Sequence, residues 1–325
     1  MTTETAQALW YIAPGQAEIR EEMLSVPLPG EARVRALFGA LSCGTEALVL
    51  AGRVPESEFK RMRAPFMGGH FPFPVKYGYA TVGFVEEGPE EHRGRTVFAL
   101  HPHQSLFNIP SGAIVPLPAT VPPHRAVLAA NMETALNAIW DAAASPADRI
   151  AIIGAGAVGS LVAFLCARLA GAEVTLVDVN ERRAELAQKL GVRFATPETA
   201  KGDCDLVVHA SGNAAGLRTA LFLAGDEATV LDLSWYGDKP VTIPLGSAFH
   251  SRRLRLISSQ VGMVAASHRS RWTHSRRLVA AVGLLSDPCL DALLAPGVAF
   301  CDLPRRLPDI LNTRDAGVCQ LISYS

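Results

Sequence analysis

The sequence lacks an excess of charge of either sign, and it lacks long apolar runs. Its 325 residues carry 30 Lys and Arg against 31 Asp and Glu, which gives a formal net charge of −1. Nothing global therefore draws the chain toward nucleic acid or an anionic membrane. The longest apolar stretches have the length of a strand or a helix, well short of the roughly 20 residues that a bilayer requires. We expect neither nucleic acid nor membrane as a partner.

Two further absences concern targeting and cysteine pairing. Residues 1–15 lack the basic end and apolar run of a signal peptide. The chain has no Cys-x-x-Cys pair, which argues against a disulfide framework and against a four-cysteine structural zinc. The six cysteines are scattered as Cys43, Cys166, Cys204, Cys289, Cys301 and Cys319. We expect a soluble, cytoplasmic protein whose cysteines are mostly small buried side chains.

What is present is a packed globular composition, with 49% hydrophobic and 19% charged residues. The length suits two domains at roughly 150 residues each. Up to about residue 117 the chain is rich in Gly and Pro, and Ala32, Val34 and Ala36 alternate with Arg33 and Arg35. Short apolar runs follow at 80–85 and 96–100. This texture predicts a mostly antiparallel, barrel-like β domain with long loops.

The middle of the chain alternates apolar strand-like runs with helical patterns. The predicted strands are 150–153, 174–177, 206–208, 229–233 and 254–257. Apolar residues from Val158 to Leu169 recur at helical spacing, and a second helical segment, 184–190, ends at Gly191. This order predicts an α/β domain with a doubly wound parallel sheet covered on both faces. We place it at 121–286, and expect 287–325 to return to the domain formed by 1–120.

The strongest motif is a glycine loop that directly follows the strand ending at residue 153. In Gly154-Ala-Gly156-Ala157-Val158-Gly159, the first glycine permits a tight turn and the second lets the backbone approach a pyrophosphate. The third lets helix and strand pack closely. The N-terminus of the following helix supplies unpaired N–H donors and the positive end of a dipole. We expect five residues of this loop to bind a dinucleotide: Gly154, Gly156, Ala157, Val158 and Gly159.

An acidic partner follows about twenty residues later, as this motif requires. Asp178, at the end of the second strand, should accept hydrogen bonds from ribose hydroxyls and repel a 2′-phosphate, which favours NAD over NADP. Arg182 and Arg183 come next and can soften that preference. We expect Arg183 and Ser211 to contribute to the coenzyme site as well.

With this order of domains established, the chain resembles the medium-chain dehydrogenase/reductase superfamily, in its zinc-type alcohol dehydrogenase branch. The resemblance covers nearly the whole length and includes some likeness to bacteriochlorophyllide hydroxyethyl dehydrogenases. It implies a GroES-like catalytic domain interrupted by a Rossmann domain, and a homodimer. Besides the glycine loop, the residues that carry it are Cys43-Gly-Thr-Glu46, Gly78-x-x-x-x-Gly83-Phe-Val-Glu86, Gly94-Arg-Thr-Val97 and Thr134-Ala135.

The departures from the family concern its catalytic zinc, which takes a Cys, a His and a second Cys. Cys43 matches the first position. Tyr79 stands where the family has His, and Ala130 falls at the third position. One ligand of three cannot hold zinc, so we expect metal-free catalysis. The alternative is a rearranged site built from Cys43 with some of His101, His103 and Glu133.

Without zinc, other groups must stabilise negative charge on a carbonyl oxygen and exchange a proton. Tyr79 is one candidate, and the charge of Lys76 can lower a tyrosine pKa. His101 aligns with a substrate-pocket position of the family and should titrate in the useful range. The resemblance also places Thr45 close to the nicotinamide. Cys43 and Glu133 complete the expected catalytic set, although Cys43 can equally be an inert buried thiol.

No acidic residue occurs from 239 to 286, a window that holds seven arginines and three histidines. Arginine makes bidentate contacts with carboxylates, so an anionic substrate is one interpretation, and a solvated basic face is the other. The main hypothesis is an NAD-dependent oxidoreductase that interconverts a secondary alcohol and a ketone. The alternatives are a zinc-free quinone or enone reductase, and an NAD-binding sensor that has lost catalysis.

Overall fold

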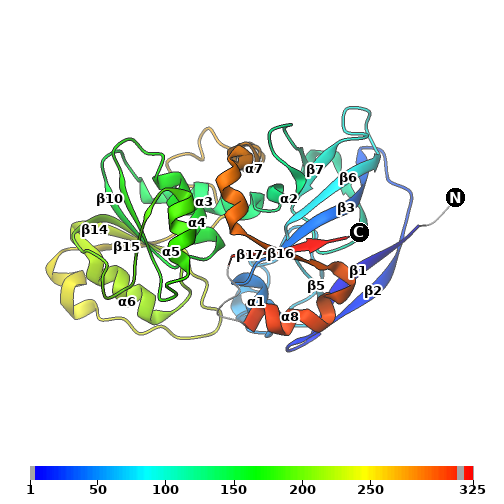
Figure 1. The fold of residues 1–325 in the computed structure, drawn as a ribbon. Helices are drawn as coiled ribbons and strands as arrows, with labels where there is room; N and C mark the ends of the chain where they lie inside the picture. Colours follow the sequence, from blue (N-terminus) through cyan, green and yellow to red (C-terminus); the bar gives the residue numbers. More distant parts are fainter. Residues whose placement is uncertain (1–3, 313–317, 325) are drawn as a thin grey trace. The chain divides into compact units, whose positions relative to one another are not determined.

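The computed structural model describes residues 4–312 and 318–324, and the chain divides into two compact units. The first comprises residues 1–130, 282–286 and 294–325, and the second comprises 131–281 and 287–293. The sequence predicted boundaries at 120/121 and 286/287. The first unit is built mainly from antiparallel strands and the second from a parallel sheet with helices (Figure 1).

The first unit contains two sheets. The smaller has the order β2-β1-β5-β4, and the larger has the order β16-β17-β3-β6-β7-β9, with β8 paired to β3. The strands are β1 (Glu4–Ala13), β2 (Gln16–Leu24), β3 (Glu31–Leu41), β4 (Gly68–Gly69), β5 (Val75–Lys76), β6 (Thr81–Glu87), β7 (Thr96–Ala99), β8 (Leu106–Pro110), β9 (Ile114–Pro116), β16 (Leu294–Ala299) and β17 (Cys319–Ser323).

Alternation along β3 builds the core of this unit. Ala32 and Val34 are fully buried and pack with Val85 of β6, Val97 of β7 and Phe107 of β8. Arg33, on the same strand, is also buried, which the alternating pattern did not predict. Its guanidinium reaches Glu4 at 2.7 Å. The last strand, β17, pairs with β3, so residues 319–323 return to the larger sheet of the first unit.

Short helices accompany these sheets. They are α1 (Thr45–Leu50), α2 (Pro123–Ala126) and α8 (Leu303–Asn312), with 3-10 turns at Glu56–Glu58, Ser111–Ala113, Leu284–Ser286 and Phe300–Asp302. Helix α1 begins two residues after Cys43 and thereby fixes the position of that thiol near β3.

The second unit is a six-stranded parallel sheet with the order β12-β11-β10-β13-β14-β15. Counted along the chain, this is the order 3-2-1-4-5-6 of a doubly wound dinucleotide fold. The strands are β10 (Arg149–Ile153), β11 (Glu173–Val177), β12 (Arg193–Ala195), β13 (Cys204–His209), β14 (Ala224–Asp232) and β15 (Arg255–Ser258). The fold class predicted from the sequence, a β catalytic domain with a Rossmann domain, is confirmed.

Helices cover this sheet. They are α3 (Ala129–Ala142), α4 (Ala157–Cys166), α5 (Arg183–Leu190), α6 (Ala214–Leu223) and α7 (His274–Gly283), with a π turn at Leu245–Phe249 and a 3-10 turn at Pro288–Leu293. Helix α4 is buried from Gly159 to its end and stops at Cys166, three residues before the predicted Leu169. Helix α5 ends as predicted, at Gly191 with φ +75°.

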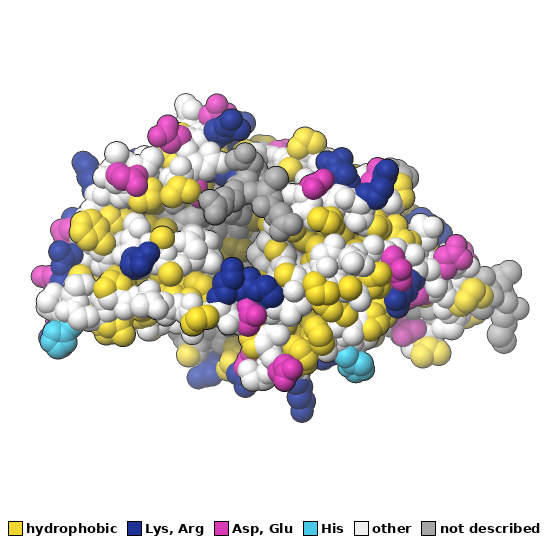
Figure 2. All heavy atoms as spheres, turned by 90° about the horizontal axis from the view of Figure 1, so that it is seen from below, with side chains coloured by type: hydrophobic (Ala, Val, Ile, Leu, Met, Phe, Trp, Pro, Cys, Tyr) yellow, Lys and Arg dark blue, Asp and Glu magenta, His cyan; other side chains and the backbone are white. Residues whose placement is uncertain are grey.

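Charges and apolar groups are spread evenly over the surface that Figure 2 presents. On that face, side chains of both signs are interspersed among apolar ones rather than gathered by sign. Within the described residues, no helix is long and apolar enough to cross a membrane.

Candidate functional site

The loop between β10 and α4 contains three glycines, and each occupies its position for a different structural reason. Gly154 has φ +106°, and a Cβ there would lie 2.9 Å from the backbone of Ala210 and Ser211. A Cβ on Gly159 would lie 2.0 Å from the carbonyl oxygen of Gly154, so only glycine lets α4 start this close to the loop. Gly156, the N-cap of α4, is exposed and has open space around it.

This geometry makes the loop an anion-binding turn. Ala157 and Val158 form the first turn of α4, where the backbone N–H groups of a helix have no partner inside it. These N–H groups and the positive end of the helix dipole favour a phosphate. Open space at Gly156 leaves room for that phosphate to come close to the backbone.

Asp178 follows β11 and already takes part in the loop. Its Oδ2 accepts the N–H of Ala155 at 2.7 Å, and its Oδ1 accepts the N–H of Asn180 at 2.9 Å. A carboxylate oxygen accepts more than one hydrogen bond, so both oxygens keep capacity for ribose hydroxyls. Arg183, the first residue of α5, lies close to Asp178 along the chain.

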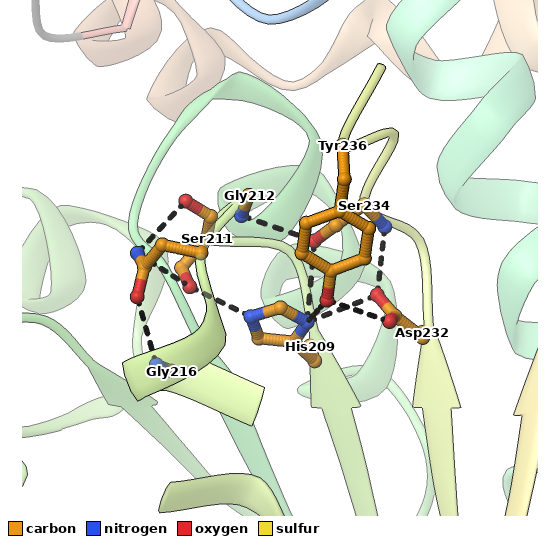
Figure 3. Close-up of polar contacts among 8 residues, drawn as sticks. His209, Ser211, Gly212, Gly216, Asp232, Ser234 and Tyr236 are labelled. Carbon is orange, nitrogen blue, oxygen red and sulfur yellow. Dashed lines mark hydrogen bonds and ion pairs between the residues drawn. The ribbon is translucent and has the colours of Figure 1, made fainter. Parts of the chain in front are cut away.

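At the ends of β13 and β14 lies a polar group (Figure 3) in which the sequence reasoning had named Ser211 but missed His209, Asp232 and Tyr236. His209 ends β13, and its Nδ1 lies 2.9 Å from Oδ1 of Asp232, which ends β14. The Nε2 of His209 lies 2.7 Å from Oγ of Ser211. Tyr236 donates its hydroxyl to Oδ2 of Asp232 at 2.8 Å. The available signal was a polar residue at or near the end of each of two apolar strands.

The carboxylate of Asp232 is stabilised as an anion. Burial alone would raise its pKa, but hydrogen bonds from His209, the backbone of Ser234 and Tyr236 bring the pKa below the usual value. Burial and the bond to Asp232 raise the pKa of Tyr236. The carboxylate is therefore an acceptor and the phenol a donor at neutral pH.

In the first unit, three predicted catalytic residues lie around the start of α1. Tyr79 lies between β5 and β6. Burial, and then the Glu46 carboxylate, raise its pKa to about 12, although hydrogen bonds with the side chains of Ser42 and Thr45 act to lower it. Burial and Glu46 also raise the pKa of Cys43 to about 11. Both groups therefore remain protonated at neutral pH.

Glu46 is the centre of this cluster, although the sequence analysis gave it no catalytic role. It is fully buried, and its Oε2 accepts from the Tyr11 hydroxyl at 2.7 Å and lies 2.9 Å from Nε2 of His103. Its Oε1 accepts the N–H of Ser42 at 2.9 Å. His103, one of the predicted metal donors, thus has one of its two ring nitrogens paired with a carboxylate.

His101 lies in the same unit but does not titrate in the useful range, contrary to the expectation from its type. Burial lowers its pKa to about 3, and its Nδ1 lies 2.9 Å from the carbonyl oxygen of Pro102. Its ring stacks on Phe107, with 3.7 Å between the centroids. The imidazole is therefore neutral at physiological pH, so it cannot serve as a charged proton donor.

The sequence suggested that Lys76 could lower the pKa of a tyrosine, but the structure does not show this effect. Its Nζ lies 2.6 Å from Glu22 and 2.8 Å from Gln104. The pKa of Tyr79 is raised rather than lowered. Lys76 instead joins β5 to β2, the strand that carries Glu22, across the smaller sheet.

Glu133, on α3 of the second unit, forms a buried ion pair. Its Oε1 lies 3.0 Å from Nε of Arg277, and the guanidinium also bonds Asn137 and the backbone oxygens of Val261 and Met263. Burial raises the pKa of Glu133 although the charge of Arg277 lowers it. Arg277 is one of the basic residues from 239 to 286, and it serves the interior of the unit.

The predicted zinc donors do not fit zinc. Of the three positions that the resemblance supplies, Tyr79 offers a protonated phenol and Ala130 offers no donor. His101 is tied to Pro102 and His103 to Glu46. Over residues 4–312 and 318–324, no group of three or more His, Cys, Asp or Glu side chains is arranged to hold a metal ion.

The two-unit fold and the glycine loop are those of the pyridine-nucleotide dehydrogenase class of architectures. Residues 150–216 match the family model of ketopantoate reductase PanE/ApbA. An uncharacterized zinc-type alcohol dehydrogenase-like protein of Haemophilus influenzae is 28% identical over 144 residues, which cover 41% of this chain and 42% of that protein. L-threonine 3-dehydrogenase of Ruegeria pomeroyi is 27% identical over 126 residues, 38% of this chain and 36% of that protein. The matches thus span less than half of these relatives.

Solved structures agree over nearly the whole chain. L-idonate 5-dehydrogenase of Escherichia coli superposes with a TM-score of 0.81 at 16% identity, covering 99% of both chains. A zinc-binding dehydrogenase of Sinorhizobium meliloti bound to NADP superposes with a TM-score of 0.77 at 16% sequence identity, covering 98% of this chain and 99% of that one. An Escherichia coli alcohol dehydrogenase with NADH superposes with a TM-score of 0.76 at 15% sequence identity, with the same coverage of both chains. The predicted resemblance is confirmed: relatives and structural neighbours are zinc-type alcohol dehydrogenase-like members of the medium-chain dehydrogenase/reductase superfamily.

The neutral, buried state of His101 makes stability depend on pH. Between pH 6.5 and about 3 the unfolded chain binds a proton at this residue and the folded chain does not. The free energy of unfolding should therefore fall by up to about 1.4 kcal/mol per pH unit as the pH drops through this range.

Thermal melts of wild type and His101→Gln between pH 7 and pH 5 test this expectation. The variant should lose stability less steeply than wild type as the pH falls. His70→Gln, at an exposed histidine of the same unit, is the control and should keep the wild-type slope. Equal slopes for wild type and His101→Gln would show that this imidazole is not held neutral.

Proposed function

We propose that the protein is an oxidoreductase that uses NAD to interconvert a small secondary alcohol and its ketone. The observation that carries this proposal is the geometry of the 154–159 loop, where one glycine is open to a phosphate and two are required by close backbone contacts. The sequence relatives, which include named dehydrogenases, support the class of reaction.

The residues present fit a nicotinamide dinucleotide. The loop amides and the N-terminus of α4 bind the pyrophosphate, and Asp178 binds the adenosine ribose. The nicotinamide ring, when bound, exchanges a hydride with the carbon that carries the alcohol or carbonyl. Arg183 and Ser211 belong to the same edge of the sheet and complete the proposed set.

The first unit supplies hydrogen-bond donors to the substrate oxygen in this proposal. Tyr79 and Cys43 remain protonated at neutral pH, and Thr45 carries a hydroxyl beside them. A protonated phenol can donate to an oxygen that becomes negative during hydride transfer, which is the task that zinc performs in relatives that bind it. We therefore propose catalysis without zinc, in which Glu133 has a structural role through Arg277.

A second candidate function, an NAD-binding sensor without turnover, has one observation in its favour. The titratable groups His101, His103 and Glu133 are all held by other protein groups in the described structure. Assays with NAD and a panel of alcohols and ketones separate the two candidates, since only the enzyme changes the absorbance of the nicotinamide.

Gly156→Val tests the phosphate loop without disturbing the fold. A Cβ at this exposed position meets no protein atom within 4 Å, so the melting temperature should be unchanged. Affinity for NAD should fall by at least about tenfold, because the branched side chain fills the place of the phosphate. Isothermal titration measures the affinity. Gly159→Ala should show the opposite pattern, with a lower melting temperature, because its Cβ meets the carbonyl of Gly154. Unaltered affinity in Gly156→Val would remove the loop from the coenzyme site.

Asp178→Ala tests the coenzyme preference. Removal of the carboxylate removes repulsion of a 2′-phosphate, so the ratio of NAD to NADP affinity should fall about tenfold. Because Asp178 also accepts the Ala155 N–H, Asp178→Asn serves as the control that retains an acceptor without the charge. If both variants keep the wild-type ratio, the ribose assignment is wrong.

Elemental analysis of the purified protein tests the metal-free proposal. We expect well below one equivalent of zinc per chain, and turnover that survives dialysis against a chelator. Tyr79→Phe should then reduce kcat by about 100-fold, the effect typical of losing one donor to a developing oxyanion. Stoichiometric zinc, or activity abolished by the chelator and restored by zinc, would contradict the proposal.

A further inference from the structure

The loop that precedes β4 contains a turn with a phenyl ring at a position that favours glycine. The N–H of Met67 donates to the carbonyl oxygen of Ala64 at 3.2 Å and closes a four-residue turn. Pro65 holds the second position, where its ring fixes a negative φ, and Phe66 holds the third with φ +56°. This is the pattern of a type II turn, whose third residue is normally Gly or Asn. A bulky side chain there is a strained exception.

Phe66 is held in this conformation although the fold gains little from its side chain. The guanidinium of Arg63 donates to the carbonyl oxygens of Met67 at 2.9 Å and of Gly69 at 3.0 Å, which fixes the turn from one side. Phe66 itself is 44% exposed, so much of its apolar surface stays in water. A strained residue that contributes little buried surface points to a role in binding.

The phenyl ring of Phe66 is the outer layer of a stack of three rings. The innermost ring, of Phe107, is buried and lies 3.7 Å from that of His101, with 10° between their planes. The ring of Phe66 lies 5.8 Å from the other side of this pair, against His101, at an interplanar angle of 26°. Among the residues that the structure describes, Phe66 stacks on no other ring. The stack therefore ends in an exposed aromatic face.

This face adjoins the residues proposed to handle the substrate oxygen. Strands β6 and β7 are antiparallel, with Thr81 opposite Ala99, and Oγ1 of Thr81 donates to the carbonyl oxygen of His101 at 3.0 Å. Tyr79 comes two residues before Thr81, and His101 comes two residues after Ala99. The phenol of Tyr79 and the stack on His101 therefore belong to the same end of this strand pair.

We propose that the exposed face of Phe66 is a stacking platform for a planar aromatic or conjugated group attached to the carbonyl carbon of the substrate. The inference rests on the proposed function and names the kind of ketone that it takes. Flat rings gain from offset stacking beyond the area that they bury, and a saturated ring of the same size does not. Phe66 thus determines specificity and takes no part in hydride or proton transfer.

The test compares acetophenone with cyclohexyl methyl ketone, which share the methyl ketone and differ in the planarity of the ring. Ligand-observed NMR titrations of the full chain with NAD measure both affinities without turnover, because the oxidised coenzyme cannot reduce a ketone. Wild type should bind acetophenone more tightly. Phe66→Leu, which keeps an apolar contact with His101, should reduce the ratio of the two affinities about 3- to 10-fold, the size of one aromatic pair.

Three further variants make the test specific. Phe66→Tyr keeps the ring and should keep the ratio. Phe66→Gly suits the turn, so it should fold and lower the ratio as Phe66→Leu does. Phe84→Leu is the matched control, since it removes a phenyl that is 41% exposed on β6 of the same unit, and it should change neither affinity. Melting temperatures of all variants should stay close to that of wild type.

The outcomes separate this inference from the proposed function. A wild type that binds the two ketones equally or binds neither, or an unchanged ratio in Phe66→Leu and Phe66→Gly, overturns the platform and leaves the oxidoreductase proposal in place. Absence of turnover with every alcohol and ketone of a panel overturns the oxidoreductase proposal instead, and the two affinities still decide whether Phe66 binds a flat group.

Discussion

The close approach of Gly159 to the carbonyl of Gly154 is the contact on which the rest of the second unit depends. Because no Cβ intervenes, only three residues separate the end of β10 from the start of α4, and the unpaired N–H groups of α4 lie at the carboxyl edge of the sheet. The positive φ of Gly154 carries the backbone past Ala210 and Ser211, so the turns after β10 and β13 meet at the point where the strand order reverses. In doubly wound sheets this is where ligands bind.

In the first unit, unlike at the glycine loop with its unpaired N–H groups, the polar groups around Glu46 are largely hydrogen-bonded to one another. Glu46 is fully buried and accepts from Tyr11, His103 and the backbone of Ser42. A buried carboxylate needs such donors to remain charged. Burial first, and then the Glu46 carboxylate, raise the pKa of Tyr79 and of Cys43, so both stay protonated. A cluster of this kind can donate hydrogen bonds to a substrate oxygen.

The sequence alone predicted most strands of the parallel sheet, the glycine loop, Asp178 and the stop of α5 at Gly191, because each follows from local patterns. It missed groups whose partners are distant in sequence. The buried pair of Arg277 and Glu133 joins residues 144 positions apart, and nothing local distinguishes Arg277 from its exposed neighbours. His101 was expected to titrate because of its residue type, but burial against Phe107 reverses that expectation. Pairing of His209 with Asp232 depends on the register of β13 with β14.

The turns after β10 and β13 differ in what specifies them, which explains why one is visible in the sequence and the other is not. At the first turn every close contact is made by backbone, so only glycine satisfies it and the motif is a run of glycines. At the second turn Gly216 makes room for a side chain, the Ser211 hydroxyl, and the remaining specification lies in His209 and Asp232 behind it. Backbone amides offer donors, which suit phosphates. The first turn is thus specified by backbone contacts alone, and the second by side chains that come from the ends of two strands, so only the first is visible as a local sequence motif.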